Sequence, residues 1–161
     1  MSAQVWIAIL VGIAAVMDDL SRRHIANWIP VAALAGGFGW QIGTAGWSGA
    51  LTASLGTAAG FAVFLLFYLL GGMGGGDVKL MAGFGALLGP MRLGEAALWT
   101  AGVGGVLAVL AIGWKSLRGW IQRKPGRALE TALTEEEQQR EASIPYAPAI
   151  ALGVWLALVP K

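Results

Sequence analysis

The sequence predicts an all-α integral membrane protein: a bundle of six transmembrane helices with both termini on the outer, periplasmic side. Of the 161 residues, 57% are hydrophobic and 12% are charged, whereas a soluble domain carries roughly 25% charged residues. The apolar residues are gathered in six runs, and most basic residues lie in two of the connections between them. These observations indicate that the chain folds with the lipid bilayer as its solvent.

Six apolar runs account for the predicted helices. Only the third and the fifth reach the roughly 20 residues that span a bilayer comfortably, so the others are expected to be short or tilted. The fourth would cover only about half of the hydrocarbon core at about 1.5 Å per residue, which leaves a re-entrant segment as the alternative. In chain order the runs are residues 3–17, 28–42, 51–70, 78–88, 96–114 and 145–159.

Basic residues decide whether the fourth run crosses the membrane. Arg22 and Arg23 follow the first run, and a basic cluster follows the fifth, so both connections are expected on the cytoplasmic side. Two connections on one side need an even number of crossings between them. The run 78–88 is therefore expected to cross, extended at both ends by the preceding glycines and by residues 89–93. Every basic residue except Arg92 and Lys161 then lies inside.

The connections between the runs are too short to fold alone, so residues 1–161 are expected to form a single membrane-embedded domain. The longest connection, at about residues 115–143, is expected to be a cytoplasmic loop. Two small-xxx-small patterns, at residues 56–60 and 85–89, are explained by close helix packing within the bundle. They give only weak support for a homo-oligomer.

The sequence leaves few reactive side chains for chemistry. It has no cysteine and a single histidine, His24, which excludes a thiol nucleophile, a cysteine zinc site and a histidine-based metal site. The glycine-rich run fits neither nucleotide-binding glycine motif. No metal, cofactor or nucleic acid is therefore expected. A serine–lysine pair stays open on composition alone, but carboxylates are the main candidates.

An aspartate, Asp77, follows a run of glycines between two apolar runs, with Met73 as the only interruption in residues 71–76. An ionisable group so placed costs about 2 to 4 kcal/mol on insertion scales and is a functional candidate by default. The glycines make a poor helix, and irregular backbone at membrane depth is tolerated only beside protein or a wet cavity. Asp77 is expected to face water and another polar group; the alternative is a simple helix N-cap.

The predicted topology brings further carboxylates to the same membrane boundary. Asp18 and Asp19 end the first run and Asp77 opens the fourth, so all three fall on the cytoplasmic side and can meet. Two carboxylates sharing a site titrate as a coupled pair, one ionised and one protonated. In an aspartic protease the ionised member takes a proton from water and the protonated one polarises the scissile carbonyl.

Three segments carry a resemblance to a known family. Residues 19–28 (DLSRRHIANW) resemble the D-x-R-x-R-x-I-P-N segment that follows the first helix of type IV prepilin peptidases. Residues 74–79 (GGGDVK) resemble their G-x-G-D-x-K motif, and residues 144–153 (IPYAPAIALG) are similar to the I-P-Y-G-P-A-I that opens their last helix. The sequence departs from the family pattern at three positions, with Ser21 for arginine, Ala26 for proline and Ala147 for glycine. No carboxylate is lost, so the departures concern loop shape and substrate preference.

These motifs select the expected site residues. Counting back eight residues from Asn27 selects Asp19 rather than Asp18 as the first catalytic aspartate, and G-x-G-D selects Asp77 as the second. Asp18 is interpreted as an interfacial charge, because the helical offset of about 100° turns it away when Asp19 faces inward. The supporting motif positions are Gly74, Gly76 and Lys79, and Lys79 is expected to assist a carboxylate, to bind substrate or to reach the interface.

The resemblance implies an aspartic endopeptidase of the bacterial inner membrane, working at the cytoplasmic face. Its expected partners are the lipid bilayer and a type IV prepilin or pseudopilin, recognised by its basic leader peptide and first apolar helix. Larger family members also methylate the new N-terminus through an insertion with paired CxxC motifs, and this chain has neither. It is therefore similar to the compact, peptidase-only enzymes of tight-adherence (Flp) pili.

Two other classes of protein stay open. A small proton- or cation-coupled transporter would use the same carboxylates, but its site is expected near the midplane of the membrane. A membrane assembly factor would use the aspartates structurally. The sequence places both aspartates at one boundary and shows no convincing repeat, which favours the peptidase.

Overall fold

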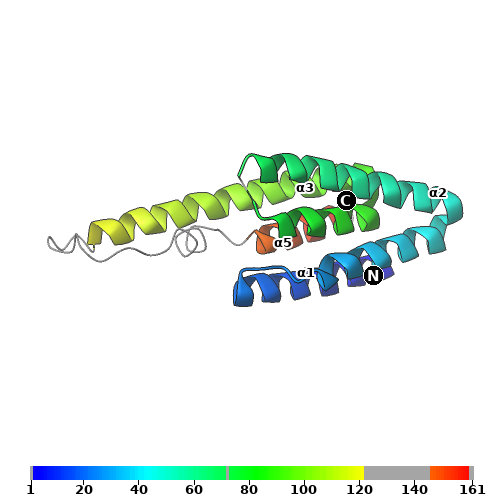
Figure 1. The fold of residues 1–161 in the computed structure, drawn as a ribbon, viewed down its shortest axis with the longest axis horizontal. Coiled ribbons are helices and arrows are strands. Elements are labelled where there is room, and N and C mark those ends of the chain that lie inside the picture. The colour runs from blue at the N-terminus through cyan, green and yellow to red at the C-terminus, as the bar shows by residue number, and fades with distance from the viewer. Residues whose placement is uncertain (1, 72, 122–145, 160–161) are drawn as a thin grey trace.

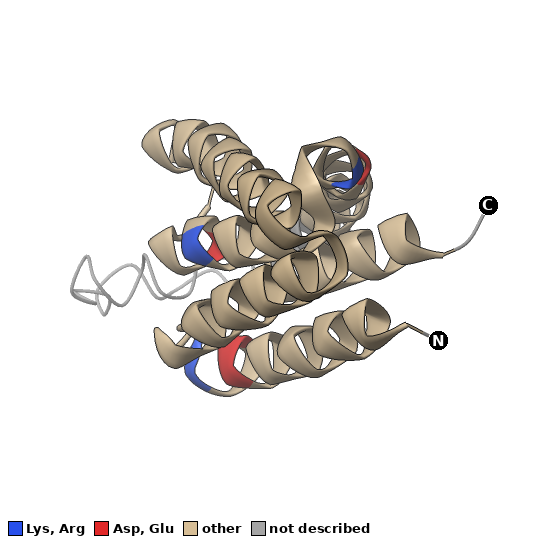
Figure 2. Cartoon of the chain, turned by 90° about the vertical axis from the view of Figure 1, so that its right-hand side faces the viewer, with Lys and Arg blue, Asp and Glu red and all other residues tan. Residues whose placement is uncertain are grey.

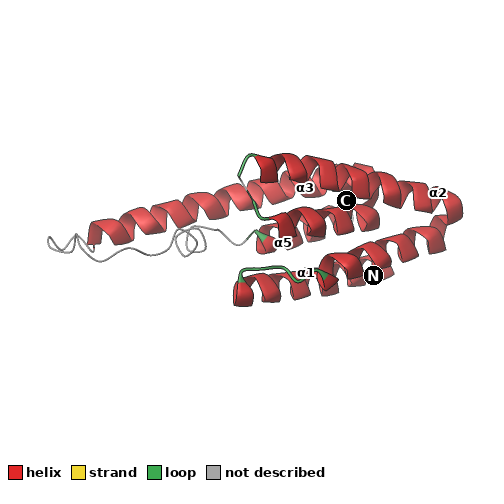
Figure 3. Ribbon diagram, viewed as in Figure 1, coloured by secondary structure: helices red, strands yellow, loops and turns green. Residues whose placement is uncertain are grey.

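The computed structural model describes residues 2–71, 73–121 and 146–159, and all regular secondary structure in them is helical (Figure 3). Three helices are long and apolar enough to cross a membrane, over Ala3–Arg22, Trp28–Leu69 and Gly75–Leu110. This confirms a helical integral membrane protein. The elements are α1 (Ala3–Arg22), α2 (Trp28–Leu69), α3 (Gly75–Ile121) and α5 (Ala147–Leu158).

Both long helices, α2 and α3, reverse direction at a glycine (Figure 1). Gly46 has φ 57° and ψ −132°, and Gly89 has φ 73° and ψ 170°, backbone conformations that residues with a side chain rarely adopt. Within the described residues the chain thus forms six helical segments: α1, the two parts of α2, the two parts of α3, and α5. These segments correspond in order to the six predicted runs, whereas the number of membrane crossings stays a prediction.

The reversal at Gly89 corrects one expectation. The fourth run was expected to extend through residues 89–93, but it ends at Gly89, and Pro90 and Leu93 belong to the second part of α3. The positive φ of Gly89 breaks the helix, and Pro90 has no backbone N–H to continue the hydrogen-bond ladder. At its other end the run does extend into the glycines, because α3 begins at Gly75.

Two glutamine side chains hydrogen-bond the backbone next to this reversal. Gln4 donates from Nε2 to the carbonyl oxygen of Leu87 over 2.8 Å, and Gln41 donates to the same oxygen over 3.2 Å. Carbonyls in the last turn of a helix lack an intrahelical partner, and in a bilayer no water replaces it. The side chains of α1 and α2 therefore stabilise the point at which α3 turns back.

The first part of α3 forms the centre of the bundle, where Leu80, Met81, Phe84 and Leu87 are completely buried. Glycines allow the neighbouring helices to approach it at backbone distance. A side chain added at Gly85 would meet the backbone of Gly56 in α2, and one added at Gly56 would meet that of Gly85. The small-residue patterns thus pack helices of the same chain, as small residues do in membrane bundles.

The remaining helices pack so that three helix ends meet. α1 and α5 run antiparallel: Trp155 donates from Nε1 to the carbonyl oxygen of Ala8 over 3.1 Å, and Gly12 lies against the Trp155 ring. The end of α1 and the starts of α3 and α5 therefore lie at the same end of the bundle (Figure 1). Charged residues of the described part gather near helix ends, with long uncharged stretches between them (Figure 2).

Candidate active site

Asp19 lies in the last turn of α1 and is only 8% exposed. Its Oδ2 accepts a hydrogen bond from the backbone N–H of Ala147 over 3.2 Å. Ala147 is the first residue of α5, and helix N-termini carry unpaired N–H groups and a partial positive charge. The start of α5 thus supplies a favourable partner for a carboxylate that is 128 positions away in the sequence.

Asp77 is the third residue of α3 and is 7% exposed. Its Oδ2 accepts the backbone N–H of Gly74 over 3.2 Å, while its own N–H donates to the Gly74 carbonyl over 3.1 Å. This is the returning half of a capping box, in which the third helical residue bonds back to the residue before the helix. Asp77 is therefore not the N-cap residue itself, because it is the third residue inside α3. Its side chain nevertheless caps the start of the helix through Gly74.

The structure brings Asp19 and Asp77 together at one end of the bundle. They are the only acidic residues among the buried polar groups of the described chain, and they lie at the end of the bundle at which α1 ends and α3 begins (Figure 1). In each carboxylate the backbone hydrogen bond uses Oδ2. Within the described residues the Oδ1 atom of each accepts no further hydrogen bond, so it can bind a water molecule or, when the carboxyl group is protonated, donate to a peptide carbonyl.

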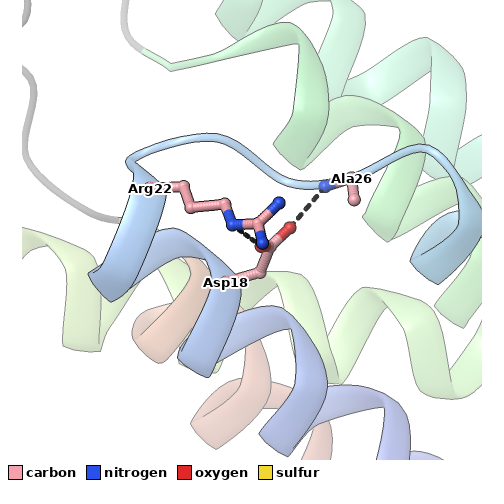
Figure 4. A network of polar contacts seen from close by, with 3 residues as sticks. All are labelled: Asp18, Arg22 and Ala26. Carbon is pink, nitrogen blue, oxygen red and sulfur yellow. Dashed lines mark hydrogen bonds and ion pairs between the residues drawn. The ribbon is translucent and has the colours of Figure 1, made fainter.

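The Asp18 side chain contacts the connection between α1 and α2 (Figure 4). Its Oδ2 accepts the backbone N–H of Ala26 over 2.7 Å, and its Oδ1 lies 3.6 Å from Nε of Arg22. The recorded contacts of the side chain are with this connection and with its own helix.

The three supporting motif positions have separate roles. Gly74 supplies the N–H that binds Asp77. Gly76 lies against Ile25, and a Cβ atom added there would be 3.2 Å from the Ile25 Cβ. Lys79 is exposed and donates from Nζ to Oδ1 of Asn27 over 3.0 Å. The structure thus places Lys79 on the connection to α2 rather than on either carboxylate.

Sequence reasoning missed three contributors to this site: Ile25, Asn27 as the partner of Lys79, and the N–H of Ala147. Ile25 and Asn27 lie inside the motif that located Asp19, so the motif was the signal that could have found them. The role of Ala147 depends on a backbone group, which carries no residue-type signature.

The described residues offer no group of three or more His, Cys, Asp or Glu side chains that could hold a metal ion. A cavity of about 850 Å³ lies at the opposite end of α1 and α5, lined by residues such as Gln4, Arg92 and Trp155, and includes neither aspartate. The two buried carboxylates are therefore the candidate reactive groups in this part of the chain.

The long apolar helices and the buried carboxylate pair define a multi-pass membrane protein of the helical class. Residues 6–112, which include both aspartates, match the sequence model of the type IV leader peptidase family. The match covers more than half of the chain, so the chain belongs to this family and is a protease. No curated protein and no solved structure gives a significant match.

Proposed function

We propose that the chain is a membrane-embedded aspartic endopeptidase that removes the basic leader peptide of type IV prepilins or pseudopilins. The observation that carries this proposal is the burial of Asp19 and Asp77 at one end of the bundle, each with one oxygen bonded to a backbone N–H. Membership of the type IV leader peptidase family supports the substrate class.

The chemistry follows from a pair of carboxylates that share one proton. The ionised member takes a proton from a water molecule, and the resulting hydroxide oxygen attacks the scissile carbonyl carbon. The protonated member donates to the carbonyl oxygen, and a proton then passes to the amide nitrogen as the C–N bond breaks. Because the sequence contains no cysteine, the chain lacks the CxxC insertion of the bifunctional enzymes, and we propose that it does not methylate the product.

The proposed location is the bacterial inner membrane, with the site at the cytoplasmic face. Arg22 and Arg23 lie at the end of α1 beside the site, and basic residues near membrane spans favour the cytoplasmic side. A prepilin would then present its basic leader in the cytoplasm and keep its first apolar helix in the bilayer.

Cleavage by the purified protein tests the proposal. The wild-type chain in detergent is incubated with a prepilin that retains its leader, and mass spectrometry identifies the new N-terminus. We expect a single cut at the end of the leader. A protein that leaves the prepilin intact but moves protons or cations across proteoliposomes would instead be the transporter that the same carboxylates could serve.

A further inference from the structure

The short connection between α1 and α2, residues 23–27, folds back over the end of α1. Arg23 adopts a left-handed conformation with φ 51°, and its N–H donates to the Asp19 carbonyl over 2.8 Å. This conformation ends the helix and reverses the chain. The connection is thereby directed toward the first turn of α3, which holds Asp77.

Asp18 is the side chain that fastens this connection (Figure 4). Its Oδ2 accepts the Ala26 N–H over 2.7 Å, a short hydrogen bond to a charged acceptor. The contact with Arg22 is longer, at 3.6 Å, and the Arg22 side chain is 76% exposed against 16% for Asp18. An exposed ion pair of this kind contributes little, so the bond to Ala26 is the more important contact.

The fastened connection touches α3 on both sides of Asp77. Ile25, which is 5% exposed, packs against Gly76 just before the aspartate. Asn27 accepts the hydrogen bond from Lys79 just after it. Direct packing between α1 and α3 is slight compared with the packing of α1 on α5 and α2. The connection is therefore a direct link between the helix that carries Asp19 and the turn that carries Asp77, beside the indirect link through α5 and α2, which pack on both α1 and α3.

We propose that Asp18 is a positioning residue, which holds Asp77 in register with Asp19 through the 23–27 connection. The inference rests on the proposed peptidase function. Asp18 and Asp19 are adjacent in α1. Asp19 faces the reacting bond, and Asp18 fixes the 23–27 connection that positions Asp77. Small displacements of reacting groups, about 1 Å, lower rates by as much as 10²-fold, so the loss of this link is expected to lower kcat more than it affects substrate binding.

Three substitutions separate the hydrogen bond from the charge. Asp18→Ala removes the acceptor and is expected to lower kcat for prepilin cleavage by about 10- to 100-fold with KM within about 2-fold. Asp18→Asn keeps an acceptor oxygen for the Ala26 N–H and is expected to retain most of the activity. Arg22→Ala, the matched control, breaks only the exposed ion pair and is expected to behave as the wild type.

A double-mutant cycle tests whether Asp18 affects kcat through the 23–27 connection. Asn27→Ala breaks an exposed contact and is expected to lower kcat several-fold without loss of folded protein. Combined with Asp18→Ala, the losses in kcat should be less than additive, because both substitutions release the same segment. If Asp18→Ala fails to accumulate in the membrane, Asn27→Ala carries the test alone, and an unchanged kcat there would overturn the proposal.

The outcomes distinguish this inference from the proposed function. If folded Asp18→Ala cleaves as fast as Arg22→Ala, or if the cycle is additive, Asp18 does not position the pair even though the protein is a peptidase. If instead Asp19→Asn and Asp77→Asn both retain full activity, the peptidase site itself has been assigned wrongly.

Discussion

The carboxylates of Asp19 and Asp77 each accept a hydrogen bond at the N-terminal end of a helix. The two residues themselves lie at different helix ends, one C-terminal and one N-terminal. Asp77 belongs to the first turn of α3 and bonds back to Gly74, whereas Asp19 ends α1 and bonds to Ala147 at the start of α5. Unpaired N–H groups at helix N-termini favour negative charge. Two helix N-termini thus make it tolerable to bury two carboxylates within an apolar bundle.

The first prediction concerns these two side chains. Asp19→Asn and Asp77→Asn are each expected to lower kcat for leader cleavage by about 10³-fold or more, because neither amide can exchange the proton that the mechanism requires. Both variants should accumulate in the membrane, since the substitution removes a buried charge. The measurement is cleavage by purified protein, with membrane content determined by immunoblot.

Glu95→Gln is the matched control, since it removes a half-buried carboxylate that lines the cavity at the other end of α1 and α5. It is expected to leave cleavage unchanged. Full activity in both aspartate variants would contradict the proposed dyad.

The second prediction concerns metal and thiol reagents. The sequence has no cysteine, and the described residues contain no cluster suited to a metal ion. Leader cleavage is therefore expected to be unchanged by EDTA, by phenanthroline and by N-ethylmaleimide. An activity lost with a chelator and restored by a divalent metal would show that the carboxylates hold an ion.

At the scale of the elements, the position of Asp77 depends on how closely α2 approaches α3. The facing backbones at Gly56 and Gly85 meet directly, and Gly60 lies against the backbone of Met81 one turn nearer the site. Glycine is required at these positions because α2 and α3 approach each other closely. Backbone conformation is not the reason, since the residues are helical and need no unusual φ.

The third prediction tests this packing. Gly85→Ala places a methyl group against the Gly56 backbone and is expected to destabilise the protein by about 1 to 3 kcal/mol, the usual cost of overpacking. Gly102→Ala is the matched control, since nothing lies within 4 Å of a Cβ atom built there. Thermal unfolding in detergent compares the two; equal melting temperatures would show that α2 and α3 can separate without cost.

The fourth prediction concerns the reversal of α3 at Gly89. Gln4→Leu leaves the Leu87 carbonyl with Gln41 as its remaining side-chain partner and is expected to cost about 1 to 2 kcal/mol of unfolding free energy. Ser54→Ala is the control, because the exposed Ser54 hydroxyl only donates to the carbonyl of Ala50 in its own helix. A loss from Ser54→Ala as large as that from Gln4→Leu would contradict a special role for the glutamine.

At the scale of the whole molecule, the six helical segments of the described residues run alternately toward and away from the end of the bundle at which α1 ends and α3 begins (Figure 1). The alternation is what six membrane crossings require. It also places the first and last described residues, at the start of α1 and the end of α5, at the end opposite the aspartates.

The fifth prediction is the sidedness of this arrangement. In the cysteine-free chain, Ser48→Cys near the Gly46 reversal is expected to react with a membrane-impermeant thiol reagent added to intact cells or spheroplasts. Ser21→Cys, beside the aspartates, should react only after the membrane is permeabilised. Both serines are exposed, so labelling of the two from the same side would contradict the six-crossing topology.

The membrane class and the family could be predicted from the sequence because they depend on local properties, and the choice of Asp19 and Asp77 as the catalytic pair stays a prediction. Apolar runs show in any window of about 20 residues. The spacing from Asn27 to Asp19 and the glycines before Asp77 are likewise readable within ten residues. The family match over residues 6–112 confirms what these short patterns indicated about the family.

The contacts that complete the site were decided only by the tertiary structure. The bond from Ala147 to Asp19 joins residues 128 positions apart at the site, and the bonds from Gln4 and Gln41 to Leu87 join distant residues at the opposite end of the bundle. Backbone groups that share such bonds have no signature in the sequence, and the register of packed helices depends on side-chain fit across the whole bundle. The sequence therefore determined which residues carry the charge, and tertiary packing determined what holds them in place.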